Sequence, residues 1–299
     1  MDAALGGYEP RTATVRVETP SGPGAMTYLD FGDADRPVDV VFLHANGFNA
    51  RSYRSILAPL ADRLRIVAPD QRGHGATALG TATEGRTSWH DMKDDLLAFL
   101  AAMKLGRVAL AGHSMGGTAS LLAAAEAPEK VRALALFDPV VLPRVSLTSE
   151  GMRDAIASPL VHGALKRRRA FPSRQAVIDA YRGRGAFRTW TEEMLADYVT
   201  AGFNDLPDGT VELACSPEWE VSNYVSQAHD SWAAFERSIC PIHILKADTD
   251  STGRLDEGLE PLIAAGRVRI EVIPGTTHFL PMERPDLVRA ALLEAAAAP

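Results

Sequence analysis

A Gly-x-Ser-x-Gly motif, formed by Gly112, Ser114 and Gly116, lies where an apolar run meets a run rich in Ala and Leu. Residues 107–111 have the length and apolar content of a buried strand, and residues 115–127 predict a helix that the following proline ends. A nucleophilic serine has to project from a strained strand-to-helix turn, and small neighbours prevent steric clashes there. The motif therefore predicts a strand, a tight turn carrying Ser114, and a helix.

The rest of the chain alternates between apolar strand-like runs and longer helical runs. An N-terminal hairpin is predicted at residues 12–18 and 25–31. Further strands are predicted at 38–43, 65–68, 131–137, 242–245 and 268–273, with helices at 53–63, 89–103 and from 285 to the end. Alternating strands and helices predict an α/β fold with a doubly wound, mostly parallel sheet covered on both faces.

This alternation stops between Asp138 and Ile239, where arginine-rich and aromatic helical segments follow one another, separated by Gly and Pro. We expect a core domain of residues 1–138 and 239–299. Residues 139–238 are expected to form an inserted helical cap, or lid, domain. Because the insertion divides the sheet in sequence, the two parts of the core should fold together.

Composition excludes several classes of protein. The 299 residues are 46% apolar, enough for a large buried core, and the net charge of -7 disfavours nucleic acid as a partner. A basic run at 166–169 is expected to be a solvated helix face. No run approaches the roughly 18 apolar residues of a membrane span. Oligomeric state cannot be inferred from the chain.

The two cysteines, Cys215 and Cys240, are too few and too poorly grouped for a disulfide framework or a zinc site. We expect free thiols, no metal and no organic cofactor. The N-terminal residues lack the basic start and apolar stretch of a signal peptide. These features predict a soluble cytoplasmic protein.

A serine nucleophile needs a base, and His278 is best placed to supply it. His278 lies just after the strand at 268–273 and before the last helix, where parallel sheets place their sites. The histidine in turn needs an acid to fix its tautomer. We predict Asp250 for this role because a strand-end acid must reach across its turn, and Asp248 and Asp138 remain alternatives.

Backbone amides are expected to stabilise the oxyanion. One donor is the amide of Met115, which follows the nucleophile, and the other is assigned to Asn46 in the loop after the strand at 38–43. Phe48 in the same loop is expected to line the acyl side. His44 and His74 are expected to brace their loops by hydrogen bonds, because the base is already supplied.

Taken together, these segments resemble the α/β-hydrolase superfamily, which places Ser, Asp and His in this order along the chain. The resemblance rests on GHSMGG at 112–117, HANGF at 44–48, DQRGHG at 70–75, ADTD at 247–250 and PGTTHF at 274–279. It implies the fold, a serine esterase- or lactonase-like activity and a catalytic triad. Ala45 and Ala247 depart from it, since the family has glycine at both positions.

A serine nucleophile argues against haloalkane dehalogenase and epoxide hydrolase chemistry, which use a carboxylate at this position. The predicted function is therefore hydrolysis of a small to medium-sized carboxylic ester through an acyl-enzyme. A lactonase, a carbon-carbon bond hydrolase and a non-catalytic ligand receptor remain alternatives. Aromatic residues of the cap are expected mainly to pack, with Trp219 chosen as a substrate contact.

Overall fold

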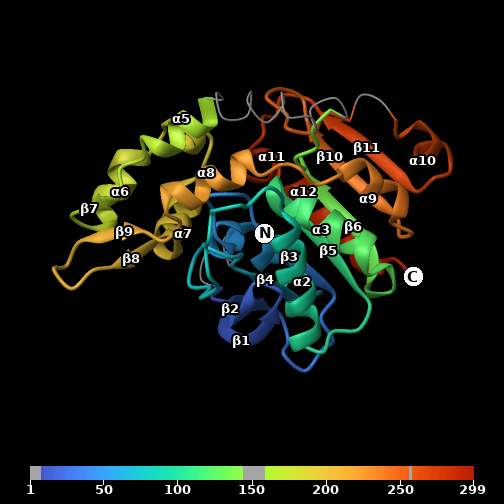
Figure 1. The fold of residues 1–299 in the computed structure, drawn as a ribbon, viewed down its shortest axis with the longest axis horizontal. Coiled ribbons are helices and arrows are strands. Elements are labelled where there is room, and N and C mark those ends of the chain that lie inside the picture. Colours follow the sequence, from blue (N-terminus) through green and yellow to red (C-terminus); the bar gives the residue numbers. More distant parts are fainter. Residues whose placement is uncertain (1–7, 144–158, 256–257) are drawn as a thin grey trace.

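The computed structural model describes residues 8–143, 159–255 and 258–299, in which an eight-stranded sheet forms the core (Figure 1). The strand order is β1-β2-β4-β3-β5-β6-β10-β11. The strands are β1 Arg11–Thr19, β2 Gly22–Phe31, β3 Val40–Leu43, β4 Ile66–Pro69, β5 Val108–His113, β6 Val131–Phe137, β10 Ile242–Ala247 and β11 Val268–Ile273. The pairs β1/β2 and β2/β4 are antiparallel and the others are parallel. The predicted sheet and hairpin are confirmed.

The helices of the described residues are α1 Arg54–Leu57, α2 His90–Ala102, α3 Met115–Glu126, α5 Pro159–Leu165, α6 Arg174–Tyr181, α7 Glu192–Gly202, α8 Pro217–Val225, α9 Ser231–Arg237, α10 Glu260–Ala264, α11 Leu280–Glu283 and α12 Pro285–Ala297. Of these, α1 and α12 pack on one face of the large sheet, and α2, α3 and α9 pack on the other. Short 3₁₀ helices are η1 Ala50–Tyr53, η2 Ala58–Leu60, η3 Pro128–Lys130 and η5 Gly185–Phe187.

Neighbouring residues of a central strand face opposite sides of the sheet. In β3, Val40 and Phe42 belong to the apolar cluster that includes α1 and α12, whereas Val41 and Leu43 belong to the cluster of α2, α3 and α9. Both faces of the strand are therefore buried. This is why the parallel strands are continuous apolar runs in the sequence.

The inserted segment differs from the prediction in two ways. Besides helices α5–α8, it contains a three-stranded antiparallel sheet of β7 Ala170–Phe171, β9 Val211–Leu213 and β8 Phe203–Asp205, so it is not purely helical. In addition, α9 packs on α3, and its Trp232 and Phe235 belong to a core cluster. Residues 231–238, expected in the cap, therefore lie with the core, and α5–α8 with the small sheet lie to one side (Figure 1). We use the word cap below for α5–α8 and β7–β9.

Buried hydrogen bonds and an ion pair connect the cap with the core. Arg54 of α1 donates from Nε to both carboxylate oxygens of Asp197 in α7, at 2.8 and 2.9 Å. Both side chains are over nine-tenths buried, which excludes competing water. Asn49 also donates to the Tyr198 carbonyl oxygen at 3.1 Å.

The basic run at 166–169 is not a uniform solvated face. Lys166, Arg168 and Arg169 are exposed, but Arg167 is half-buried. Its guanidinium donates to Glu220 Oε2 at 2.5 Å and to the Tyr198 hydroxyl at 2.6 Å. The expected solvated face is wrong for Arg167, because the chain after α5 turns this side chain toward α7 and α8.

Candidate active site

Ser114 lies in a strained turn between β5 and α3. Its backbone angles, φ 54° and ψ -121°, fall outside the regions that residues other than glycine usually adopt. A Cβ on Gly112 would lie 2.4 Å from the Gly116 carbonyl carbon, and one on Gly116 would lie 2.4 Å from the Leu43 carbonyl oxygen. Both glycines are therefore required by close backbone approach, as the motif predicts.

His278 lies beside Ser114, in the loop that follows β11. The distance between His278 Nε2 and Ser114 Oγ is 3.0 Å, within hydrogen-bonding reach of a base for its nucleophile. On the other side of the ring, His278 Nδ1 lies 2.6 Å from Asp138 Oδ2. The structure thus joins a serine, a histidine and a carboxylate in one hydrogen-bonded chain.

The carboxylate beside His278 is that of Asp138, not of Asp250, so the prediction of Asp250 is wrong. Asp250 is exposed, with φ at 53°, in the loop after β10. Asp138 follows β6, whose neighbour in the sheet is β10, and its amide donates to the Leu245 carbonyl oxygen at 2.8 Å. Asp248 instead accepts a hydrogen bond at 3.1 Å from the Gly275 backbone N–H, in the loop after β11.

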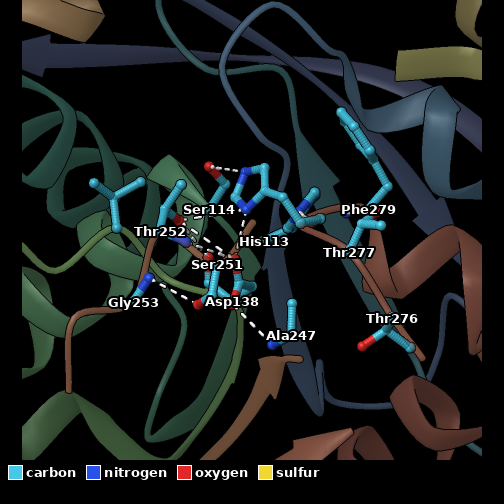
Figure 2. A network of polar contacts seen from close by, with 12 residues as sticks. His113, Ser114, Asp138, Ala247, Ser251, Thr252, Gly253, Thr276, Thr277 and Phe279 are labelled. Atoms are coloured by element: carbon cyan, nitrogen blue, oxygen red, sulfur yellow. Dashed lines mark hydrogen bonds and ion pairs between the residues drawn. The ribbon is translucent and has the colours of Figure 1, made fainter. Parts of the chain in front are cut away.

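Several donors hold the buried Asp138 carboxylate in place (Figure 2). Oδ1 accepts from the Ala247 amide at 2.9 Å and from the Ser251 hydroxyl at 2.6 Å, and Oδ2 accepts from the Thr252 amide at 3.1 Å. Burial alone would raise the pKa of Asp138. The hydrogen bond from His278 and its charge, together with the hydrogen bonds from Ser251 and the Ala247 backbone, outweigh burial and lower the pKa. Asp138 is thereby kept ionised.

The loop at residues 44–48 and the start of α3 carry the predicted oxyanion donors. Met115 is the first residue of α3, where amides have no partner inside the helix. In the loop, the Ala45 amide donates to the Tyr53 hydroxyl at 3.2 Å and the Gly47 amide to His74 Nε2 at 3.0 Å. Within the described ranges, no group accepts a hydrogen bond from the backbone N–H of Asn46. That amide remains available for a ligand.

His44 and His74 brace this loop against the turn at residues 70–75. His44 donates from Nδ1 to the Ala45 carbonyl oxygen at 2.8 Å and accepts from the Gln71 amide at 2.9 Å. His74 donates from Nδ1 to the Arg72 carbonyl oxygen at 2.9 Å while accepting from Gly47. Burial lowers the pKa of His74 to about 4 and that of His44 well below its usual range. Both rings are therefore neutral braces, as expected.

Sequence reasoning missed His113, the residue before the nucleophile. It is fully buried, its Nε2 donates to the His278 carbonyl oxygen at 2.7 Å, and its Nδ1 accepts from the Tyr53 hydroxyl at 2.7 Å. Burial, then the charge of His278, lowers its pKa to about 3. Because Tyr53 also accepts from Ala45, this chain connects the loop that carries His278 with the loop that carries Asn46.

Phe48 lies at the centre of an aromatic cluster next to the site. Its ring centroid is 6.2 Å from those of His113 and Phe279 and 5.1 Å from that of Trp190. His278 in turn contacts Phe279, with ring centroids 5.8 Å apart. The place of Phe48 is compatible with the predicted acyl side, which stays a prediction.

Trp219, expected as a substrate contact, is instead buried between α8 and the turn at 70–75. Its indole Nε1 donates to the Arg72 carbonyl oxygen at 2.8 Å, and the Arg86 guanidinium lies 4.4 Å from the ring centroid. A Cβ on Gly73 would lie 2.3 Å from the indole ring. The indole is buried and packed against this turn, so the structure does not support Trp219 as a substrate contact.

Other kinds of site receive little support. In the part of the chain that the structure describes, no group of three or more His, Cys, Asp or Glu side chains is placed to hold a metal ion. Cys215 and Cys240 are buried free thiols, as predicted. A bilayer-crossing helix is absent from the described ranges, since none of their helices combines the required length and apolarity.

Comparison with known proteins gives a consistent pattern. A model of the alpha/beta hydrolase family matches residues 40–291. A haloalkane dehalogenase of Mycobacterium tuberculosis is 24% identical over 282 residues, which cover 92% of each chain. A 2-(acetamidomethylene)succinate hydrolase of Mesorhizobium japonicum is 32% identical over 99 residues, so the match spans 33% of this chain and 34% of the relative.

A solved structure shares the fold over nearly the whole chain. The crystal structure of an E-2-(acetamidomethylene)succinate hydrolase has a TM-score of 0.75 and 20% identity, covering 96% of this chain and 100% of the other. Likeness at this identity shows the arrangement of elements and leaves the substrate open.

Proposed function

Because the chain belongs to the alpha/beta hydrolase family, we propose that it is a serine hydrolase that cleaves a small to medium-sized carboxylic ester through an acyl-enzyme. One observation carries the proposal. Ser114 Oγ lies 3.0 Å from His278 Nε2, and His278 Nδ1 lies 2.6 Å from the buried Asp138 carboxylate. These are the contacts that activate a serine hydroxyl at neutral pH.

In the proposed reaction, Ser114 Oγ attacks the ester carbonyl carbon as its proton passes to His278 Nε2. Asp138 accepts from Nδ1–H throughout, which fixes the tautomer and stabilises the imidazolium. The carbonyl oxygen becomes an oxyanion that accepts from the Asn46 and Met115 amides. When the intermediate collapses, His278 gives its proton to the leaving alkoxide. Water, deprotonated by His278, then repeats the sequence on the acyl-enzyme and frees Ser114.

This proposal does not assign dehalogenase chemistry to the chain, although the chain is similar in sequence to a haloalkane dehalogenase. Displacement of a halide by Ser114 Oγ would leave an alkyl ether on the enzyme, which has no electrophilic carbonyl for water to attack. An acyl group leaves an ester, which the same histidine and amides can hydrolyse. The serine at position 114 therefore favours acyl transfer.

The test is active-site labelling combined with a substrate panel. We expect a fluorophosphonate probe to label the wild type, and Ser114→Ala to lose both labelling and hydrolysis of p-nitrophenyl butyrate. Ser120→Ala is the matched control, because Ser120 lies in the same helix and its hydroxyl donates to the Gly116 carbonyl oxygen. A panel of esters, lactones and thioesters then identifies the acyl group. A wild type that neither labels nor hydrolyses any member would favour a ligand receptor.

A further inference from the structure

Both polar atoms of the Asn46 side chain form hydrogen bonds with helix α8 of the cap. Its Nδ2 donates to the Glu220 carbonyl oxygen at 3.0 Å, and its Oδ1 accepts from Asn223 Nδ2 at 2.8 Å. Because a backbone carbonyl oxygen can only accept, the contact with Glu220 requires the NH₂ group of the Asn46 side chain to face Glu220 and its oxygen to face Asn223. Asn46 is thus held by two hydrogen bonds from an element more than 170 residues away in sequence.

Helix α8 is itself anchored in the core. Asn223 is fully buried, and its carbonyl oxygen accepts from the Trp89 indole at 2.9 Å. Near the start of the helix, Trp219 donates to the Arg72 carbonyl oxygen at 2.8 Å. Along the same helix, Ser222 accepts from Arg86 at 2.9 Å. Two core segments, the turn at residues 70–75 and residues 86–89 before α2, therefore fix the position from which Asn223 reaches Asn46.

The loop also approaches α8 closely at Gly47, where there is no room for a side chain. A Cβ on Gly47 would lie 2.9 Å from Glu220 Oε1, which is tighter than real side-chain contacts. Gly47 has φ at 73°, a value that favours glycine. The approach of Gly47 to the Glu220 side chain and the two hydrogen bonds of the Asn46 side chain all join this loop to α8.

We propose that α8 of the cap is a positioning element for the oxyanion site, and that Asn223 acts on the reaction by holding the side chain of Asn46. This inference rests on the proposed function. Oxyanion stabilisation depends on donors that already point at the developing charge before reaction. The backbone N–H of Asn46 has no acceptor among the described residues. The carbonyl oxygen of the same peptide, that of Ala45, accepts from His44 Nδ1 and from the Phe48 backbone N–H, and the two hydrogen bonds from α8 hold the other side of the residue through its side chain. The cap thereby contributes to the chemical step through α8.

The experiment is a double-mutant cycle of Asn223→Ala, Asn46→Ala and the pair. Asn46→Ala keeps the backbone donor and removes only the held side chain. Removing an oxyanion donor costs about 10²- to 10³-fold in kcat, so loosening one is expected to lower kcat about tenfold. Each single variant should lower kcat by this factor with KM unchanged, and the pair should lose no more than either alone. Glu218→Ala, at an exposed position of α8, is the matched control and should retain kcat.

A second readout separates positioning from general loosening of the fold. Butylboronic acid forms a tetrahedral adduct with an active-site serine and places an oxygen where the oxyanion would lie. Its inhibition constant should rise about as much as kcat falls, since both depend on the same donor. Thermal unfolding of each variant shows how much the fold is affected. Because Asn46 is only half-buried, Asn46→Ala tests the idea even where Asn223→Ala folds poorly.

The inference is overturned if Asn223→Ala keeps normal kcat, if the two substitutions add independently, or if boronate inhibition is unchanged while kcat falls. Failure of the proposed function gives a different result, namely a wild type that hydrolyses no ester and is not labelled at Ser114. An active wild type with an inactive Ser114→Ala and a normal Asn223→Ala would reject only the role of α8.

Discussion

Replacing Asp138 by asparagine is the sharpest test of the site, because the substitution keeps the size of a buried side chain and reverses one hydrogen bond. Oδ1 accepts from Ala247 and Ser251, and Oδ2 accepts from Thr252 and His278. Two donors that do not titrate face Oδ1, so the asparagine oxygen should occupy that position. Its NH₂ group then faces His278 Nδ1 and the Thr252 amide.

In this variant, His278 can accept at Nδ1 only by carrying its proton on Nε2, the atom that must accept the proton of Ser114. A wrong tautomer of this kind lowers kcat by about 10⁴-fold, which corresponds to about 5.4 kcal/mol of transition-state stabilisation. We expect KM to change little, because substrate binding does not use the carboxylate. The Thr252 amide, left opposite a donor, should lower the free energy of unfolding by about 1–3 kcal/mol.

The assay is steady-state hydrolysis of p-nitrophenyl butyrate, with circular dichroism to confirm folding. Asp250→Asn is the matched control, because Asp250 is exposed and lies in the neighbouring loop, and it should retain wild-type kcat. A nearly active Asp138→Asn together with a severely impaired Asp250→Asn would refute the reasoning and restore the acid predicted from the sequence.

Three further predictions concern the parts around the triad. His74 is neutral in the folded protein because burial lowers its pKa to about 4, so its contribution to stability is present above pH about 6.5 and is lost as pH falls toward 4. Urea unfolding should show that the stability lost between pH 7.5 and pH 4.5 is about 2.5 kcal/mol smaller in His74→Gln than in the wild type, in which His44 and His113 contribute further losses. Gly116→Ala places a Cβ 2.4 Å from the Leu43 carbonyl oxygen, and thermal unfolding should reveal a loss of about 1–3 kcal/mol; a variant as stable as wild type would contradict the packing argument. Tyr53→Phe leaves the Ala45 amide and His113 Nδ1 without their shared partner, so the free energy of unfolding should fall by about 1–3 kcal/mol. A Tyr28→Phe control, at a half-buried position, should change it by less.

Much of the fold follows from local sequence. The parallel strands are apolar runs because both of their faces are buried, and proline or glycine marks where neighbouring elements end. Ser114 and His278 are also recognisable locally. The glycines around Ser114 reflect backbone contacts within one turn and with the adjacent strand, and His278 follows a strand whose carboxyl end is part of the site.

The acid could not be chosen in the same way. Asp138 and Asp250 both follow strands that end at the same edge of the sheet, so local pattern permits either. The choice depends on which carboxylate receives the donors of a neighbouring loop, and Ser251 and Thr252 donate to Asp138 while Asp250 stays exposed. That contact joins residues more than 100 positions apart.

The order of elements, the turn that carries Ser114 and the position of His278 after β11 could all be predicted from the residues, because they depend on backbone geometry and burial within short segments. The carboxylate that pairs with His278, the inward turn of Arg167, the packing of Trp219 and the contacts of α8 with Asn46 could be recognised only in the folded chain. Each of these is a pairing of polar groups from distant segments. A side chain's type shows that it needs a partner when buried, but the fold determines which partner lies within reach.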